Sequence, residues 1–312
     1  MVENLHLDNT LLLGNGFSRA IFDKIPSWEC LISPSPQSIS NIKNYTFLYE
    51  MQYVSRNIKN EAEIKDNLIQ KLKDSITHQN IRKEIRGLNK FGEYLRSHHI
   101  KNIITTNYDR SIEYILCNFC EYEEDEKPLG LDPEVIYSIR TYKTLKYQNG
   151  NHTLKLWKIH GDVNRTKSIM LGFDHYCGAL AKLSSYIKGT YSSEHSSVKC
   201  SIDIETKCKN NAFDEISWAE LFFSTNVFII GSGLDFSEID IWWLLNKHIR
   251  LKNKYPQHIQ NNIYYFFNIQ YDTPERKKDI YQMLDAFQIK RIGIHSDGEY
   301  IRNIFKQIEQ CY

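Results

Sequence analysis

The sequence predicts an α/β protein built on an open, mostly parallel β-sheet with helices on both faces. Five short runs rich in apolar, β-prone residues occur at residues 11–18, 103–109, 158–162, 227–233 and 263–268. Each run ends in small or polar residues. Continuous apolar runs are typical of strands buried on both faces, and open α/β sheets bind ligands at the carboxyl ends of their strands. The pattern therefore predicts one cleft to which all five runs contribute.

Strands and helices alternate along most of the chain. The first strand is predicted at residues 10–13, and its helix begins near Phe17 or Ser18. Other apolar runs bounded by polar residues predict strands at 102–105, 154–159, 169–171, 227–230, 263–267 and 290–294. Helices are predicted at 111–120, 237–252, 274–287 and from about 299. Ser237 is the expected N-cap of its helix, with Glu238 and Asp240 in the first turn.

Two polar stretches interrupt this alternation and predict insertions into a single domain that spans residues 1–312. The first insertion, at about 31–98, has helical spacing of its apolar residues. The second, at about 176–215, is interpreted as a helical insertion or a mobile lid. The remaining core comprises residues 8–30, 99–120, 152–175 and 216–312. The acidic run 121–126 is interpreted as a solvated loop, with an anion-repelling or base-capturing site as the alternative.

Composition excludes several functional classes. The chain has 312 residues, of which 41% are hydrophobic and 25% charged, with a formal charge of +1. We therefore expect no direct binding of nucleic acid or membrane through bulk charge. No apolar run reaches the ~20 residues of a membrane span, and no signal peptide is visible. The 7 cysteines form no disulfide framework, which predicts a cytoplasmic protein with reduced thiols.

The Gly14-Asn15-Gly16 loop follows the first predicted strand and precedes a helix. In that position, backbone N–H groups can face a phosphate. The alternative is a plain tight turn, because position 19 is Arg where the dinucleotide fingerprint has Gly. No Gly-Lys-Ser/Thr sequence is present, which argues against a P-loop ATPase.

Four polar side chains end the second strand, within residues 105–109. Asn107 is placed to bind a ribose hydroxyl or a water, and Asp109 to hold the local geometry. The alternative is structural, since Asn or Asp in this position also caps the following helix.

His160 follows another strand and is succeeded by Gly161. A His with a pKa near neutrality can accept a proton from a sugar hydroxyl or a water. Gly161 allows a ligand to approach the backbone closely. The alternative is a buried, hydrogen-bonded core histidine.

The other chemically distinctive residues have structural explanations. Cys117 and Cys120 lie within a predicted helix, and the remaining cysteines and histidines lack zinc spacing, so no metal is expected. Trp242 and Trp243 predict core packing or a subunit interface, with stacking on a nucleobase as the alternative.

Taken in order, these motifs resemble those of the sirtuin superfamily. That family has a Gly-Ala-Gly-Ile-Ser-like loop, a Thr-Gln-Asn-Ile-Asp-like segment, a His-Gly pair and a Gly-Thr/Ser-Ser-like loop. The corresponding segments are residues 14–18, 105–109, 160–161 and 231–233. A ribose-contacting Asn at the end of the next strand corresponds to Asn268. The resemblance covers nearly the whole chain as an ordered series of motifs.

The resemblance implies a Rossmann-like sheet and NAD⁺ as substrate. Asn107 and His160 would be catalytic, orienting a water or the ribose and acting as the base, with Asp109 beside them. The cofactor-binding residues it implies are Gly14, Asn15, Gly16, Phe17, Ser18, Thr106, Gly231, Ser232 and Asn268.

One departure from the superfamily is informative. Deacetylating sirtuins carry two Cys-x-x-Cys pairs after the His-Gly pair, and this chain has none there. With its inserted helices it looks like the zinc-free bacterial NAD hydrolases of anti-phage defence, such as the Thoeris effector. The opening at residues 13–17 and the segment 235–243 also resemble related abortive-infection families.

The implied activity is hydrolysis of NAD⁺ to nicotinamide and ADP-ribose. Because uncontrolled hydrolysis would kill the host, we expect regulation through a homo-oligomer, a HerA-type ATPase partner or a phage-triggered sensor. Two alternatives remain: a module that binds NAD⁺ or ADP-ribose without turnover, and an ADP-ribosyltransferase or zinc-free deacylase. The trigger, the oligomeric state and the choice between NAD⁺ and NADP⁺ are not predicted.

Overall fold

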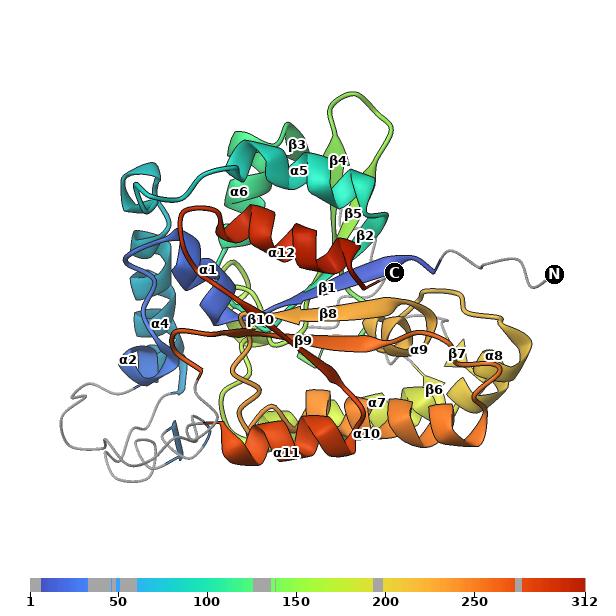
Figure 1. The fold of residues 1–312 in the computed structure, drawn as a ribbon. Coiled ribbons are helices and arrows are strands. Elements are labelled where there is room, and N and C mark those ends of the chain that lie inside the picture. Colours follow the sequence, from blue (N-terminus) through green and yellow to red (C-terminus); the bar gives the residue numbers. More distant parts are fainter. Residues whose placement is uncertain are drawn as a thin grey trace.

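The computed structural model describes residues 7–32, 46, 49–50, 61–125, 136–137, 139–192, 199–272 and 277–311. Its centre is an eight-stranded sheet with strand order β10-β9-β8-β1-β2-β5-β4-β3 (Figure 1). The strands from β10 through β5 pair in parallel, and β4 and β3 add an antiparallel edge. The predicted α/β fold class is confirmed.

The parallel strands match the apolar runs of the sequence. They are β1 (Asn9–Leu13), β2 (Ile100–Thr105), β5 (Thr153–Lys158), β8 (Asn226–Ile230), β9 (Ile263–Asn268) and β10 (Lys290–Ile294). The edge strands are β4 (Lys143–Tyr147) and β3 (Tyr122–Glu124).

Alternate residues of β1 enter different hydrophobic cores, because successive side chains of a strand point to opposite faces. Leu11 and Leu13 join one core and Leu12 joins the other. Helices cover both faces of the sheet (Figure 1). The first core includes residues of α1 (Asn15–Ile21), α5 (Leu88–Ser97), α6 (Ser111–Phe119) and α12 (Tyr300–Glu309). The second includes residues of α7 (Phe173–Ile187), α8 (Ile204–Asn210), α9 (Leu221–Ser224), α10 (Ile239–Lys254) and α11 (Lys278–Ala286).

A third, smaller core lies beside the carboxyl ends of β2 and β5. It joins α2 (Trp28–Ile32) and α4 (Glu61–Ser75) to Tyr108, Val163 and Ile169, which belong to the loops after those strands. The helices of the first polar stretch thus pack against the loops that carry the candidate site. How residues 31–98 and 176–215 divide into insertions and core stays a prediction, although the buried side of α5 belongs to the first core.

The strand order reverses between β1 and β8. From β1 the chain proceeds through β2 to β5 on one side, and it returns on the other side of β1 as β8, β9 and β10. Such a reversal creates a crevice at the carboxyl ends of the two adjacent strands, where ligands of open α/β sheets bind.

Several boundaries differ from the sequence prediction for local reasons. The strand predicted at 169–171 is wrong: those residues are irregular and follow the 3₁₀ turn η3 (Thr166–Ser168). Their apolar character instead reflects burial of Ile169 and Leu171 in the third core. Helix α1 starts at Asn15, so Gly16 lies inside its first turn.

The predicted N-cap Ser237 is also wrong. Helix α10 begins at Ile239 after Glu238, while Asp235 accepts hydrogen bonds from both the backbone N–H (2.9 Å) and the hydroxyl (2.7 Å) of Ser237. Pro274, the predicted start of the next helix, lies outside the described residues, and α11 begins at Lys278.

The acidic run at 121–126 is not a loop over its described part. Residues 122–124 form β3, because Tyr122 is buried and the strand pairs with β4. Glu124 forms ion pairs with Arg110 and with Lys143, so the basic partners of this run belong to the chain itself.

Short elements complete the described structure. They are η2 (His78–Asn80), β6 (Tyr191–Ser192), β7 (Lys199–Cys200) and η4 (Trp218–Glu220). Among the described helices, none has the length and apolar character needed to cross a membrane.

Candidate active site

A cleft of about 650 Å³ opens at the carboxyl ends of the parallel strands. Cofactor and ligand pockets typically measure roughly 300–1,000 Å³. His160 follows β5 and Asn268 ends β9, and β1 and β8 lie between these two strands in the sheet. The glycine loops after β1 and β8 therefore separate two ends of the cleft, one with His160 and one with Asn268. Residues that line the cleft include Gly14, Asn15, Gly16, Thr106, Tyr108, His160, Tyr176, Gly231, Ser232, Glu238, Asn268 and Asp272.

The glycine loops after β1 and β8 are packed directly against each other. Gly231 has a φ of +66°, and a Cβ added there would lie 2.1 Å from the backbone nitrogen of Phe17. The N–H of Gly14 donates to Ile230 (2.9 Å) and that of Gly16 to Gly231 (2.6 Å). These two N–H groups therefore join the halves of the sheet, and both already donate hydrogen bonds within the protein. The first role of these glycines is to let the two loops pack closely.

Asn107 is buried after β2 and is anchored at one end only. Its Nδ2 donates to Ser18 Oγ (2.9 Å), and Ser18 Oγ in turn lies 2.5 Å from Ser111 Oγ. Among the described residues, Asn107 Oδ1 has no hydrogen-bond partner. Buried acceptors are rarely left unsatisfied, so this oxygen is suited to receive a hydrogen bond from a bound water or ligand hydroxyl.

His160 is held by a carboxylate from the other half of the sheet. Its Nε2 lies 2.9 Å from Asp240 Oδ2, and both side chains are almost fully buried. Burial alone would lower the pKa of His160, but the charge and hydrogen bond of Asp240 outweigh it, so the pKa is raised. The edge of the ring faces Tyr176, with centroids 5.4 Å apart.

Glu238 lies near this pair at the start of α10 and lines the cleft. Burial raises the pKa of Glu238 to about 7; His160 opposes the rise, while Asp240 and Asp235 add to it. Ser232 Oγ donates to its Oε2 (3.2 Å). A carboxyl that titrates near neutrality in a cleft can exchange protons with a ligand.

Gly161 has a different role from the one the sequence suggested. Its φ is +119°, and a Cβ there would lie 2.5 Å from the carbonyl oxygen of Ser168. The close approach is made by the loop of the chain itself. The N–H of Met170 donates to the His160 carbonyl (2.9 Å), and Tyr108 Oη donates to the Met170 carbonyl, which fixes the loop around the histidine.

Buried ion pairs connect the loops that carry Asn107 and His160. Lys158 Nζ donates to the Asp109 carbonyl and lies 3.3 Å from Glu113 Oε1. Lys143 Nζ lies 2.9 Å from the same oxygen and 2.7 Å from Asp162 Oδ2. Burial raises the pKa of Glu113, but Lys158 and Lys143 outweigh that effect, so the net pKa is lowered and the carboxylate stays charged.

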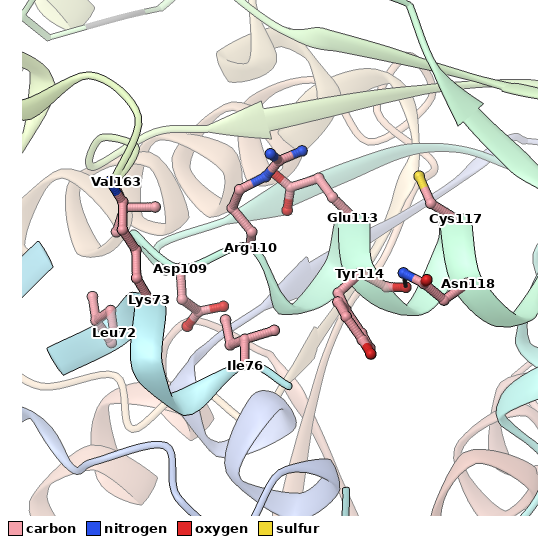
Figure 2. Close-up of a pocket in the computed structure, with 10 residues that line it drawn as sticks. All are labelled: Leu72, Lys73, Ile76, Asp109, Arg110, Glu113, Tyr114, Cys117, Asn118 and Val163. Atoms are coloured by element: carbon pink, nitrogen blue, oxygen red, sulfur yellow. Dashed lines mark hydrogen bonds and ion pairs between the residues drawn. The ribbon is translucent and has the colours of Figure 1, made fainter. Parts of the chain in front are cut away.

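Asp109 faces away from the cleft that His160 lines. Its Oδ1 accepts a hydrogen bond from the N–H of Ser111 (2.8 Å), the first residue of α6, although the N-cap position itself is Arg110. Burial is the main cause of its raised pKa. Figure 2 shows it at a second pocket of about 310 Å³, between residues of α4 and α6.

Asn268 ends β9 at the other side of the cleft. Its Nδ2 donates to Ser296 Oγ (2.6 Å), and its Oδ1 accepts from the N–H of Gln270 (2.8 Å). The carboxylate of Asp272 accepts from the Asn268 N–H (3.1 Å). This end of the cleft therefore presents hydroxyl, amide and carboxylate groups.

The structure brings most of the predicted site residues together. Seven of them line the cleft: Gly14, Asn15, Gly16, Thr106, Gly231, Ser232 and Asn268, and His160 joins them. Phe17 belongs to the first core, where its ring lies 5.8 Å from that of Phe91. Ser18 is fully buried and supports Asn107, and Asn15 Nδ2 donates to the Pro26 carbonyl (3.1 Å).

Sequence reasoning missed the roles of Asp240, Glu238, Tyr108 and Tyr176. Asp240 and Glu238 were predicted in the first turn of a helix and within the family-like segment 235–243, with no role at the site, although their position after a glycine loop was a usable signal. Tyr176 has no such signal, since only the packing of α7 brings it to His160.

The cysteines and tryptophans take structural positions. All seven cysteines are free thiols, and Cys120 is buried with its Sγ donating to the Leu88 carbonyl (3.0 Å). Within the described part of the chain, no group of three or more His, Cys, Asp or Glu side chains could hold a metal. Trp242 is buried in the second core, which confirms the core-packing interpretation for that residue.

These observations define a doubly wound α/β protein with a ligand cleft at its topological switch point. A family profile described as a SIR2-like domain matches residues 101–281, more than half of the 312 residues. The chain therefore belongs to the SIR2-like family, which confirms the resemblance to sirtuins at the level of the superfamily. SIR2-like domains bind NAD, and the family is generally enzymatic. No curated protein matches the chain.

Proposed function

We propose that the protein cleaves the nicotinamide–ribose bond of NAD⁺ and releases nicotinamide and ADP-ribose. The observation that carries the proposal is His160, buried at the end of β5, bonded to Asp240 and lining the cleft of a SIR2-like domain. Asn107, whose Oδ1 is unpaired among the described residues, lies in the loop after the neighbouring strand β2.

The cleft has the polarity that a dinucleotide requires. We assign the nicotinamide ribose to the His160 end and the adenosine to the Asn268 end, with the diphosphate across the glycine loops. Arg19, Arg82 and Lys277 line the cleft and supply positive charge for the diphosphate. Backbone N–H groups contribute less than the sequence suggested, because those of Gly14 and Gly16 are engaged.

The chemistry demands little from the protein beyond positioning. Nicotinamide leaves from a positively charged nitrogen and needs no proton, while the ribose passes through an oxocarbenium-like state. Asn107 Oδ1 would orient the attacking water or a ribose hydroxyl, and His160 would accept the proton. Asp109 would act indirectly, by fixing the loop that carries Asn107.

We further propose that the biological role is depletion of NAD⁺ in anti-phage defence, under control of assembly or a partner. Support comes from the sequence resemblance to the Thoeris effector and abortive-infection families. If a homo-oligomer is required, nicotinamide release per protein molecule should rise steeply as protein concentration increases. Full, constant activity of a strictly monomeric protein would contradict this part of the proposal.

The primary test follows nicotinamide release from NAD⁺ by chromatography. We expect release by the wild-type protein, and a loss of roughly 10²–10⁴-fold in Asn107→Ala and His160→Ala, the range of a general base. His258→Ala is the matched control, since His258 is exposed and is not among the residues that line the cleft. Unchanged turnover in both folded site variants would refute the assignment.

The products separate hydrolysis from the two alternatives. Free ADP-ribose supports hydrolysis, whereas labelled protein or acylated ADP-ribose indicates transfer or deacylation. Calorimetric binding of NAD⁺ without any product, across protein concentrations, favours a binding module or an enzyme that awaits a partner.

A further inference from the structure

Asp240 occupies an unusual position for a residue that only starts a helix. It lies in the first turn of α10, yet its side chain is 2% exposed and its Oδ2 reaches His160, 80 residues earlier in the chain. Its Oδ1 accepts a hydrogen bond from the N–H of Ile241 (3.0 Å). Both carboxylate oxygens are therefore committed, one to the helix backbone and one to the imidazole.

A carboxylate bonded to one ring nitrogen determines the tautomer of a neutral histidine. An ionised carboxylate only accepts hydrogen bonds, so Nε2 must carry the proton that it donates to Asp240. The lone pair of the neutral ring is then on Nδ1. Second-partner contacts of this kind fix ring orientation and raise the basicity of the free nitrogen.

We propose that Asp240 is a positioning residue that holds His160 as the Nε2–H tautomer, so that Nδ1 accepts the proton during NAD⁺ cleavage. The inference rests on the proposed function for its catalytic part, while the tautomer itself is a property of the free protein. It also assigns the two members of the pair to opposite halves of the sheet, after β5 and after β8.

Other ionisable groups face the His160–Asp240 pair, and their titration must be distinguished from that of His160. Glu238 is the N-cap of the same helix and interacts electrostatically with His160. Tyr176 of α7 faces the imidazole ring edge-on, and Tyr108 interacts electrostatically with Asp240 and Glu238. Burial raises the pKa of both tyrosines above the working range, so they stay neutral. Glu238 is the one of these groups that titrates near neutrality.

The tautomer is measured directly by nitrogen NMR of the full chain labelled at histidine, above the pH at which His160 titrates. His160→Gln assigns the resonances. We expect a protonated, pyrrole-type Nε2 and an unprotonated, pyridine-type Nδ1 in the wild-type protein. An Nδ1–H tautomer would overturn the proposal, and this result does not depend on any variant folding.

The kinetic arm compares the pH profiles of wild-type protein and Asp240→Asn. Without the negative charge, the pKa of His160 should fall, so the rising limb of nicotinamide release should move to lower pH. The rate of nicotinamide release on the plateau should fall by tenfold or more. The upper limit is the loss of roughly 10²–10⁴-fold that is expected when a general base is removed. Repeating the pair in a Glu238→Gln background removes the second titration. A lower plateau with an unmoved limb would overturn the positioning role, because it is the result of structural damage alone.

Asp203→Asn is the matched control. Asp203 caps α8 through a hydrogen bond from the N–H of Thr206 (2.9 Å), and Asn caps equally well. Failure of the two ideas can be told apart. No nicotinamide release by any protein at any concentration, with the expected tautomer, counts against hydrolysis by the chain alone and leaves the placement of His160 by Asp240 intact. Release by the wild type with the opposite tautomer refutes only the role of Asp240.

Discussion

At the scale of single residues, the site depends on buried side chains that do not line the cleft. Asn107 is only 1% exposed, and its orientation is set by Ser18, which the cleft does not display. Ser18 belongs to α1 and Asn107 to the loop after β2, so one buried hydrogen bond links the first strand-helix unit to the second. Ser18, which the sequence resemblance placed at the cofactor, thus supports Asn107, the residue that we propose to orient the water or the ribose.

Ser18→Ala should therefore affect both stability and turnover. The substitution leaves the Asn107 amide and the Ser111 hydroxyl without this partner, at a cost of about 1–3 kcal/mol in the free energy of unfolding. Nicotinamide release should fall while NAD⁺ binding persists. Urea unfolding and calorimetry test both expectations. Ser185→Ala removes only a hydroxyl that donates to the Lys182 carbonyl, and it should change neither.

Glu238 makes a pH-dependent prediction about stability. Its pKa in the folded protein, about 7, exceeds the ordinary value of 4.5, so between these pH values the folded state binds more protons than the unfolded chain. Its contribution to stability is therefore lost as pH rises through this window.

Glu238→Gln should then be more stable than wild type at pH 8, by roughly 3 kcal/mol, with much less difference at pH 5. Urea unfolding at the two pH values measures this difference. Exposed Glu93→Gln is the control. An identical difference at both pH values would show that Glu238 is charged in the folded protein across the whole range.

At the scale of elements, the contact between the loops after β1 and β8 holds the two halves together. The N–H groups of Gly14 and Gly16 donate hydrogen bonds to the carbonyl oxygens of Ile230 and Gly231. Gly231, which has no Cβ, leaves space for the start of α1. The glycine pattern that suggested a phosphate loop is explained first by this backbone contact. The cleft is a consequence, since it opens where these loops diverge from the strands.

Gly231→Ala should be much more destabilising than its backbone angle alone explains. Gly150 provides the comparison, since its φ is +81° and no atom lies within 4 Å of an added Cβ. Both substitutions incur roughly 1–2 kcal/mol of left-handed strain. Gly231→Ala adds an overpacking cost of about 1–3 kcal/mol from the contact with Phe17. Thermal or urea unfolding gives the difference, and equal effects would mean that the loops can move apart.

At the scale of the whole molecule, the cleft crosses the switch point of the sheet and receives residues from both halves. His160 and Thr106 come from the β2–β5 side, and Asn268 and Asp272 from the β9 side. If NAD⁺ lies across both halves, the two ends of the cleft should affect different kinetic constants. The end distant from the bond that breaks supplies binding common to the ground and transition states.

Asn268→Ala should accordingly raise KM for NAD⁺ by several-fold to about tenfold, the value of one hydrogen bond, with little change in kcat. Asn107→Ala should mainly lower kcat. Steady-state nicotinamide release measures both constants, and Asn149→Ala in the distant β4–β5 turn is the control. A loss of kcat without a change of KM in Asn268→Ala would contradict the assignment of the adenosine end.

The sequence by itself determined the sheet and the location of the cleft. Residues 11–13 and 227–230 predict buried strands, because apolar side chains at every position need cover on both faces. The positions of His160, Thr106 and Asn268 follow, since parallel strands bring their carboxyl ends to one edge. Tertiary structure alone decided what each polar group contacts. No local pattern could show that Asp240 meets His160 across 80 residues, that Ser18 holds Asn107, or that the glycines face each other. Those contacts depend on the strand order, and periodicity along a chain records burial and secondary structure but carries no information about which strands become neighbours.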